Sequence, residues 1–244
     1  MSALFIIIPA YNEAENIENT IDEWYPVIKK YDADGASRLI IIDDGSKDDT
    51  LKLANKKAEN NPYIKVISKE NSGHGASIYF GYKYALENGA DYIFQTDSDG
   101  QTLAEEFYSF WTDREKYDVL IGNRGRRKDG FGRKTISFVV RAVVFTVFKV
   151  RAEDVNTPYR LMKREALEKA LNFVPENFNL TNIALTAVFL RLNIKVGFKN
   201  ITFKPRQGGK NSINIPKIIK IGIKAFFDLC KIESGLFKYD KGKS

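Results

Sequence analysis

Three short polar clusters in the sequence contain the residue types that bind a metal ion or a nucleotide. The richest cluster is DSDGQ at residues 97–101, where the carboxylates of Asp97 and Asp99 stand next to the side-chain amide of Gln101. Such oxygens are ligands of hard divalent cations, and the ion can hold diphosphate oxygens and help a phosphate leaving group to depart. An isolated Asp-x-Asp more often forms a solvated turn, so the interpretation as a metal site depends on the other clusters.

The other two clusters are PAYNE at residues 9–13 and DDGS at residues 43–46. One carboxylate of DDGS can accept an N–H of a nucleotide base, although the same residues also suit a turn and a helix N-cap. A glycine-bearing loop, NSGHG at residues 71–75, suits the close approach of a nucleotide or a sugar. The loop does not match a dinucleotide fingerprint, and we interpret His74 as a local hydrogen-bonding residue rather than a base.

Apolar, β-rich runs precede these clusters, and segments with helical periodicity separate the runs. The expected strands are Leu4–Ile8, Leu39–Ile42, Ile64–Ile67, Tyr92–Phe94 and Val119–Ile121. The expected helices are Glu13–Tyr31, Asp48–Glu59 with a start at Ser46, Ala76–Asn88 and Leu103–Arg114. This alternation predicts an α/β fold with a parallel sheet covered by helices on both faces. Since ligands bind beyond the carboxyl ends of such strands, we expect the three clusters to meet at one edge of the sheet.

The pattern changes after Gly122. Residues 123–133 form a basic, glycine-bearing segment, and no clean β-α alternation follows it. The expected elements there are helices at Ser137–Val150, Lys163–Leu171 and Thr181–Leu192, a strand at Ile194–Phe203 and a basic loop at Pro205–Ser212. We therefore expect a different construction in the second half of the chain, within a single domain of residues 1–244.

Composition limits the chemistry and the partners. The chain has one cysteine and one histidine, which excludes an intramolecular disulfide and a Cys- or His-based zinc site, so any metal must be held by oxygen atoms. The segment Met1–Pro9 does not have the pattern of a signal peptide, and no run reaches the ~20 apolar residues that span a bilayer, so we expect a cytoplasmic protein. The net charge of +7 predicts an anionic partner: a phosphorylated small molecule, a membrane surface or nucleic acid.

The C-terminal segment 215–244 has the pattern of a basic amphipathic helix. Charged and apolar positions recur at helical spacing on neighbouring sides: Lys217, Lys220, Lys224, Asp228 and Lys231, next to Ile218, Ile221, Ala225, Phe226 and Leu229. Such a helix can lie on anionic lipid, or it can be an ordinary surface helix packed on the core. The apolar segment Ile136–Val150 is open to the same two interpretations.

Several motifs together, in their order and spacing, resemble glycosyltransferase family 2 and its GT-A nucleotide-sugar-binding fold. They are IIIPAYNEAENI, IIDDGSKDDT, NSGHGAS, QTDSDGQT and IGNR, all within about the first 125 residues. The later DVNTPYRLMKREAL and FKPRQGGKNSIN resemble the polyprenol-phosphate branch of that family, of which dolichol-phosphate mannosyltransferase is the familiar member. The resemblance implies a Rossmann-like, mostly parallel sheet flanked by helices, with residues 1–125 as the nucleotide-sugar half, 126–214 as the acceptor side and 215–244 as a helical extension.

The resemblance also implies roles for individual residues. The nucleoside would be lined by Pro9, Tyr11, Glu13 and Asp44, with Asp43, Gly73 and Ser98 beside them. A Mg²⁺ or Mn²⁺ ion would be held by Asp97, Asp99 and Gln101. On the acceptor side, Arg124 would contact phosphate near the reacting centre, Asp154 would lie near the sugar and the acceptor, and Arg206 and Lys210 would form a later basic pair, more closely spaced than in the family. The residues expected to be catalytic are Asp99, Arg124, Asp154 and Arg206.

The second half lacks a general base where related enzymes have one. Family members that use a hydroxyl acceptor place a carboxylate at the start of a helix there, but the corresponding stretch Asn177–Asn182 contains no acid, and Glu176 is the nearest. An attacking phosphate oxygen needs no base, only positioning and cations that offset the repulsion between two phosphates. The candidate cations are Arg124, Arg126, Arg127, Arg133, Arg160 and Arg206.

The sequence therefore predicts an inverting glycosyltransferase that moves a hexose from a UDP- or GDP-sugar to a polyprenyl phosphate and that can bind the cytoplasmic membrane face through its C-terminal helix. The alternative with the same donor site is a soluble family 2 enzyme that adds sugar to a glycan hydroxyl, with Glu176 or Asp154 as base. A non-catalytic basic protein is disfavoured because the acids cluster where a cation site would be. The basic residues show no RNA- or DNA-binding module, so we expect no nucleic-acid partner.

Overall fold

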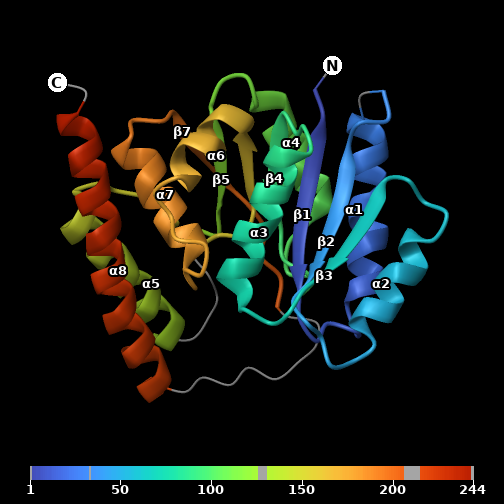
Figure 1. Ribbon diagram of the computed structural model, residues 1–244, viewed down its shortest axis with the longest axis horizontal. Coiled ribbons are helices and arrows are strands. Elements are labelled where there is room, and N and C mark those ends of the chain that lie inside the picture. Colours follow the sequence, from blue (N-terminus) through green and yellow to red (C-terminus); the bar gives the residue numbers. More distant parts are fainter. Residues whose placement is uncertain (1, 33, 126–130, 206–214, 243–244) are drawn as a thin grey trace.

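The computed structural model describes residues 2–32, 34–125, 131–205 and 215–242 of the chain. Its centre is a seven-stranded sheet with the strand order β3-β2-β1-β4-β6-β5-β7 (Figure 1). The strands are β1 (Leu4–Ala10), β2 (Arg38–Asp43), β3 (Ile64–Ser68), β4 (Tyr92–Gln95), β5 (Val119–Asn123), β6 (Arg160–Lys163) and β7 (Val196–Asn200). Every strand expected from the sequence is present, and the predicted α/β fold is confirmed.

Strand β6 is a correction to the sequence-based expectation, which has no strand before a helix at Lys163. It pairs antiparallel with β4 and β5, whereas the other neighbouring strands pair in parallel. Its four residues, RLMK, are too few for a periodic pattern, and both partners lie far away in the sequence, so a local pattern does not reveal it. Because β6 runs against its neighbours, the residues that precede it lie at the carboxyl edge of β4 and β5.

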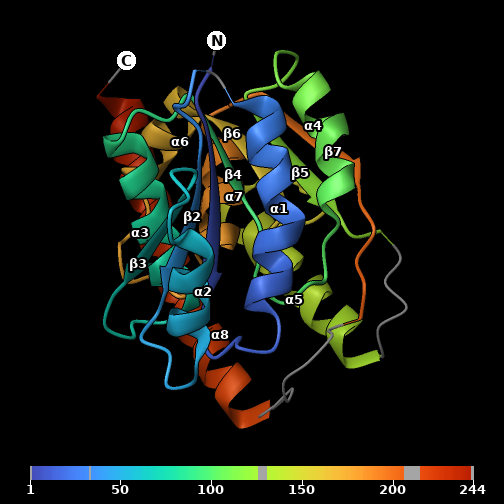
Figure 2. The same cartoon turned by 90° about the vertical axis from the view of Figure 1, so that its right-hand side faces the viewer.

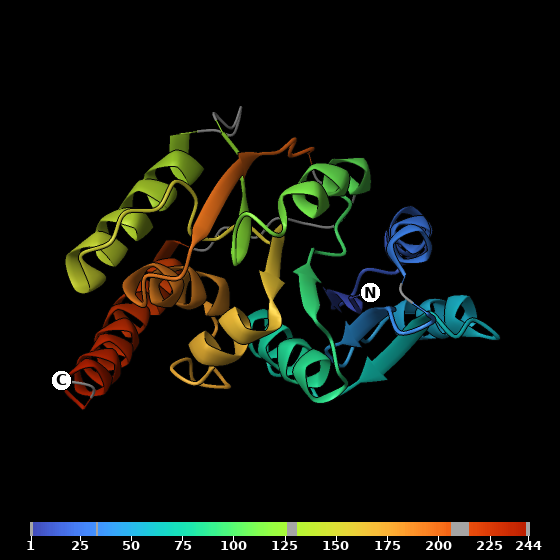
Figure 3. The same cartoon turned by 90° about the horizontal axis from the view of Figure 1, so that it is seen from above.

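Helices cover both faces of the sheet. They are α1 (Ile17–Tyr31), α2 (Thr50–Ala58), α3 (His74–Glu87), α4 (Phe107–Asp113, after the 3-10 turn η1, Ala104–Glu106), α5 (Phe131–Phe148), α6 (Arg164–Leu171), α7 (Thr181–Arg191) and α8 (Ile215–Lys241). Helices α1, α2 and α4 lie on one face, and α3, α6 and α7 lie on the other (Figures 2 and 3). Helices α5 and α8 pack against each other beside α7 (Figure 1).

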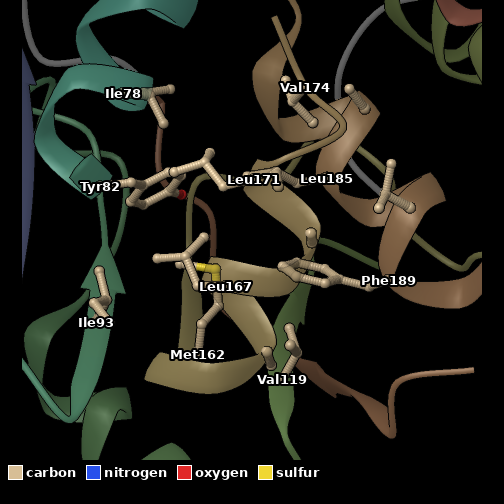
Figure 4. Close-up of a cluster of buried hydrophobic side chains, with 14 of the residues drawn as sticks. Ile78, Tyr82, Ile93, Val119, Met162, Leu167, Leu171, Val174, Leu185 and Phe189 are labelled. Atoms are coloured by element: carbon tan, nitrogen blue, oxygen red, sulfur yellow. The ribbon is translucent and has the colours of Figure 1, made fainter. Parts of the chain in front are cut away.

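Two apolar clusters, one on each face of the sheet, hold these layers together. Trp24 of α1 and Phe107 of α4 belong to the first cluster. The second joins α3, α6 and α7 to the sheet, with the side chains shown in Figure 4: Ile78, Tyr82, Ile93, Val119, Met162, Leu167, Leu171, Val174, Leu185 and Phe189. Helix α3 lies close to β1 because of Gly81, where an added Cβ would stand 2.4 Å from Ile7 Cγ2. This close packing fixes the start of α3 relative to the strand ends.

Several helix ends differ from the sequence-based expectation. Helix α1 begins at Ile17 rather than Glu13, and α2 begins at Thr50 rather than just after Ser46. Ser46 does not start the helix, because its Oγ accepts a hydrogen bond from the backbone N–H of Asn12 at 3.0 Å. A contact between the ends of two strands therefore replaces the expected local cap.

Helix α8 confirms the C-terminal helix that the pattern predicts. Arg191 of α7 holds its second half, with ion pairs to Glu233 at 2.9 Å and to Asp240 at 2.8 Å. Ala225 and Leu229 are buried, in agreement with the expected apolar side. Within the described ranges, no helix combines the length and the apolar character needed to cross a membrane.

Candidate active site

An open cleft of about 410 Å³ lies at the carboxyl edge of the sheet. Strands β1 and β4 are neighbours, but the chain leads from β1 to β2 on one side and from β4 toward β6 and β5 on the other, so the cleft lies at the topological switch point of the sheet. Its walls come from the segments after β1, β2 and β4 and from the start of α3: Pro9, Ala10, Tyr11, Glu13, Asp44, Asn71, Gly73, His74, Ser77, Asp97, Ser98 and Asp99. The three polar clusters of the sequence therefore meet at this edge.

Contacts to the segment after β2 fix the turn that follows β1. Asn12 has a φ of 53°, a left-handed conformation that asparagine tolerates better than most residues. Its backbone N–H donates to Ser46, and its Oδ1 accepts a hydrogen bond from the backbone N–H of Lys47 at 2.8 Å. Glu13 is buried beside this turn, whereas Tyr11 is 43% exposed and lines the cleft. The turn thus presents an aromatic ring on a fixed backbone.

Asp44 shapes the loop between β3 and α3. Its carboxylate accepts hydrogen bonds from the backbone N–H groups of Ser72 and Gly73, both at 2.9 Å, and from Lys69 Nζ. Burial by itself would raise the pKa of Asp44, but the hydrogen bonds from Lys69 and Ser72 outweigh it and lower the pKa below its ordinary value. The carboxylate is therefore ionised and holds one wall of the cleft in place.

Asp97 and Asp99 line the cleft from the segment that follows β4. Asp97 Oδ1 is buried and receives no hydrogen bond from the described residues, and His74 Nε2 lies 3.6 Å away, beyond hydrogen-bonding distance. Leaving such an oxygen unpaired is unfavourable, and a hard cation is a partner that suits it. No group of three His, Cys, Asp or Glu side chains in the described part of the chain could hold an ion, so further ligands would come from elsewhere, such as diphosphate or water. The two carboxylates fit a Mg²⁺ or Mn²⁺ ion of this kind.

Ser98 and Gln101 connect this segment to its neighbours. Ser98 Oγ donates to the Pro9 carbonyl at 2.9 Å and so ties the end of β4 to the end of β1. Gln101 Nε2 donates to the Lys204 carbonyl at 2.8 Å, and the residue is not among those that line the cleft. Unlike Asp97 and Asp99, Gln101 does not line the cleft, and its side-chain nitrogen is bound to the protein. Its amide oxygen is the atom that could bind an ion.

Arg124 and Asp154 form a bidentate ion pair at the same edge of the sheet. Arg124 follows β5 and Asp154 precedes β6, and the antiparallel pairing of these strands brings the two residues together. The distances are 2.7 Å from Arg124 Nε to Asp154 Oδ2 and 2.9 Å from Arg124 Nη2 to Asp154 Oδ1. Burial opposes the ionisation of Asp154, but Arg124 outweighs it and lowers the pKa of Asp154 to about 2. Asp154 is therefore an ionised partner of Arg124 and a weak base at neutral pH.

The other candidates for the acceptor side lie elsewhere. Arg160, expected among the cations for phosphate, is fully buried, and its hydrogen bonds go to backbone carbonyls of the protein. Glu176 is exposed, lies 3.5 Å from Lys83 and lines a separate cavity on the outer side of α3. The remaining candidates, or their side chains, lie outside the described part of the chain: Arg126, Arg127, Arg133, Arg206 and Lys210.

The cleft also contains residues to which the sequence analysis gives no ligand role: Ala10, Asn71, His74 and Ser77. The side chain of Asn71 donates to the Asp44 carbonyl at 2.9 Å, so it supports the same wall as Lys69. The only local signal for Lys69 and Asn71 is their place just after β3. Asp43, by contrast, is expected beside the nucleoside but is not among the residues that line the cleft. Its carboxylate accepts a hydrogen bond from Ser68 Oγ at 2.8 Å.

Comparison with known proteins identifies relatives along most of the chain. The model of the family described as glycosyl transferase family 2 matches residues 5–175. The undecaprenyl-phosphate 4-deoxy-4-formamido-L-arabinose transferase of Proteus mirabilis is 26% identical over 219 residues, which cover 88% of this chain and 64% of that protein. The undecaprenyl-phosphate mannosyltransferase of Micrococcus luteus is 25% identical over 215 residues, which cover 85% of this chain and 86% of that protein. The chain thus spans less than two thirds of the length of the Proteus relative.

Solved structures share the fold. A crystal structure of glucosyl-3-phosphoglycerate synthase from Mycobacterium tuberculosis, in complex with Mn²⁺, UDP-glucose and phosphoglyceric acid, has a TM-score of 0.69 and 18% identity, and the match covers 96% of this chain and 80% of that chain. At this identity the likeness concerns the fold alone, and it confirms the expected GT-A architecture. The motifs at the strand ends, the strand order and the matching family model agree, and the chain belongs to glycosyl transferase family 2.

Proposed function

We propose that this chain transfers a hexose, with inversion, from a nucleotide sugar to a polyprenyl phosphate. The observation that carries the proposal is the ion pair of Arg124 and Asp154. A hydroxyl acceptor needs a general base, but Asp154, with its pKa lowered to about 2, is a poor one, and Glu176 lies outside the cleft. A phosphate acceptor is already ionised and needs only positioning next to a cation. The names of the Proteus and Micrococcus relatives support this class of acceptor.

The cleft supplies the donor site in this proposal. Tyr11, Glu13 and Asp44 line the cleft and would surround the nucleoside, and Asp97 and Asp99 would hold a divalent ion. The ion, Mg²⁺ or Mn²⁺, would offset the negative charge that develops on the departing nucleoside diphosphate. The Mn²⁺ and UDP-glucose in the mycobacterial crystal structure support a donor and a metal of these classes.

The donor and the acceptor are tested together. We expect transfer from a UDP- or GDP-hexose to undecaprenyl phosphate or a shorter polyprenyl phosphate, dependent on Mn²⁺ or Mg²⁺ and abolished by EDTA. The products are measured by thin-layer chromatography of radiolabelled lipid, and the anomeric configuration by NMR. Each donor is also incubated with the free polyprenol, which has a hydroxyl in place of the phosphate. A sugar hydroxyl that proves a far better acceptor than any lipid phosphate would refute the proposal in favour of glycan synthesis.

We further propose that α5 and α8 hold the enzyme on an anionic membrane, on the cytoplasmic face. Helix α5 buries Val144 and Phe148 on one side. On its other side, Phe138 is 66% exposed, Val139 is 52% exposed and Phe145 is 44% exposed. An apolar helix with such an exposed side is typical of an interaction surface. Beside it, α8 exposes two phenylalanines and several lysines, and the charge of the lysines suits anionic lipid: Phe227, Phe237, Lys224, Lys231, Lys238 and Lys241.

The membrane surface predicts a defined loss of vesicle binding. Replacing both Phe138 and Phe145 by serine should weaken binding to phosphatidylglycerol-containing vesicles by about tenfold or more, since each buried Phe contributes on the order of 2 kcal/mol. Binding, measured by sedimentation, should also fall with added salt because the lysines act through screened charge. Tyr108→Ser is the control, because this aromatic residue is 61% exposed on α4, on the other face of the sheet. Equal loss in the control variant would contradict the assignment of the surface.

A further inference from the structure

Arg160, the first residue of β6, places a guanidinium group in the interior of the protein. The residue is 0% exposed. Its Nε and Nη2 donate to the Thr157 carbonyl at 3.1 and 2.7 Å, and its Nη1 donates to the Asn182 carbonyl at 3.2 Å. No ion pair found in the described part of the chain includes Arg160, and burial lowers its pKa. A buried cation that binds only carbonyls is unfavourable for folding, so a role of the guanidinium other than stability is indicated.

The guanidinium connects the segment before β6 to the start of α7. Thr157 belongs to the loop that begins with Asp154, the partner of Arg124. Asn182 lies in the first turn of α7, next to Thr181, whose Oγ1 donates to the Gly75 carbonyl at 2.9 Å. Gly75 follows the loop that Asp44 holds at the donor wall of the cleft. A chain of contacts thus leads from the Arg124–Asp154 pair through Arg160 to the donor loop.

The surroundings of Arg160 are polar although they are buried. Asn182 Oδ1 and Gln95 Nε2 are buried without a hydrogen-bond partner among the described residues. Gln95 is the residue of β4 that pairs with Arg160 in the sheet. Each buried group without a partner destabilises a protein by about 1 to 3 kcal/mol. An apolar interior would be more stable at this point, and proteins tolerate such a cost where function requires it.

We propose that Arg160 is a positioning residue, which holds the Arg124–Asp154 pair at a fixed place relative to the donor loop. The inference rests on the proposed function, in which Arg124 receives the acceptor phosphate. The planar guanidinium binds both carbonyls at once, and the compact ammonium of lysine does not reproduce this geometry. Arg160 acts through Arg124 and does not itself contact the substrates.

The test is Arg160→Lys, with Arg160→Met as the second variant. We expect kcat for transfer to polyprenyl phosphate to fall about a hundredfold, the effect of a displacement of about 1 Å at a reacting centre. The KM for the nucleotide sugar should change by less than about threefold, because the donor wall is held separately by Asp44. If kcat falls and the KM for the nucleotide sugar rises by the same factor, the variant has general damage to the fold. That result would overturn the inference.

Arg164→Lys is the matched control. Arg164 lies four residues further along, donates from Nη1 to the Ala90 carbonyl at 3.1 Å, and belongs to the amino edge of the sheet. It shares the contact between a guanidinium and a carbonyl but is remote from the cleft. We expect its kcat to stay within about twofold of the wild-type value. A loss equal to that of Arg160→Lys would show that the guanidinium at 160 has no special role.

A double-mutant cycle tests whether Arg160 acts through Arg124. If it does, Arg160→Lys should add less than about threefold to the loss that Arg124→Ala causes alone, whereas independent residues would multiply their effects. A second readout does not depend on catalysis: the Nε–H signal of Arg124 in ¹H–¹⁵N NMR, which reports its bond to Asp154. This signal should shift or broaden in both Arg160 variants and stay unchanged in Arg164→Lys.

The two proposals fail in different ways. A wild-type chain that transfers sugar to no lipid phosphate refutes the proposed function, while a shifted Arg124 signal in the Arg160 variants still supports the positioning role. An unchanged Arg124 signal in Arg160→Lys or in Arg160→Met refutes the positioning role, whatever the acceptor is. If Arg160→Lys does not fold, the same measurement on Arg160→Met decides.

Discussion

Replacing Asp97 by asparagine is expected to lower the turnover of the nucleotide sugar by a factor on the order of 1,000, while the protein stays folded. The carboxylate lines the cleft, and its Oδ1 is buried without a hydrogen bond from the described residues, so an amide of the same shape removes charge but no protein contact at this atom. Without the charge, the divalent ion binds weakly, and the negative charge on the departing diphosphate is less well offset. Asp99→Asn should have a similar effect. Turnover is measured over a titration of Mn²⁺, and folding by thermal unfolding without metal.

Asp22→Asn is the control for this experiment. Asp22 lies on α1, where its carboxylate binds Lys57 on the surface. The change removes the same charge at a distance from the cleft, and we expect wild-type turnover. If Asp97→Asn and Asp99→Asn retain full activity in EDTA, the metal role of this segment is wrong.

Replacing Arg124 by alanine is expected to cause the second large loss, in both activity and stability. Activity should fall by a factor on the order of 100 to 1,000, because the cation that receives the acceptor phosphate is removed. Stability should fall by about 3 kcal/mol, because Asp154 remains as a buried charge without its partner. The pH dependence of unfolding tests this contact: the pKa of Asp154 is lowered to about 2, so the stability it contributes is present above pH ~4 and is lost as the pH falls toward 2.

A double variant separates the two effects. Arg124→Ala combined with Asp154→Ala removes both charges, so it should recover part of the stability that Arg124→Ala loses, but it should not recover activity. Glu176→Gln is the control for the acids, since Glu176 is exposed and lines a separate cavity, and we expect it to keep wild-type activity. Loss of transfer in Glu176→Gln, together with retained activity in Arg124→Ala, would contradict the phosphate-acceptor mechanism.

The donor side of the site follows from local sequence. Asp97, Tyr11 and Asp44 each stand just after an apolar run, and parallel strands bring such positions to one edge of a sheet, so their convergence could be predicted without coordinates. The local pattern alone does not separate Asp43 from Asp44; the family resemblance places Asp44 at the nucleoside, and the cleft lining agrees. Neighbouring residues at a strand end point in different directions, and only the position of the loop after β3 decides which of them reaches the cleft.

The α/β alternation, the order of the motifs and the polar clusters of the donor cleft follow from local sequence, because each depends on residues close together in the chain. The acceptor side depends on contacts between distant segments. Strand β6 exists because β4 and β5 pair with it, and its antiparallel direction brings Asp154 to Arg124. Arg124 is paired with the carboxylate of Asp154, whereas Arg160 is buried and donates to backbone carbonyls. Charge and residue type are equal at the two positions, so their different roles depend on packing between segments that are distant in the sequence.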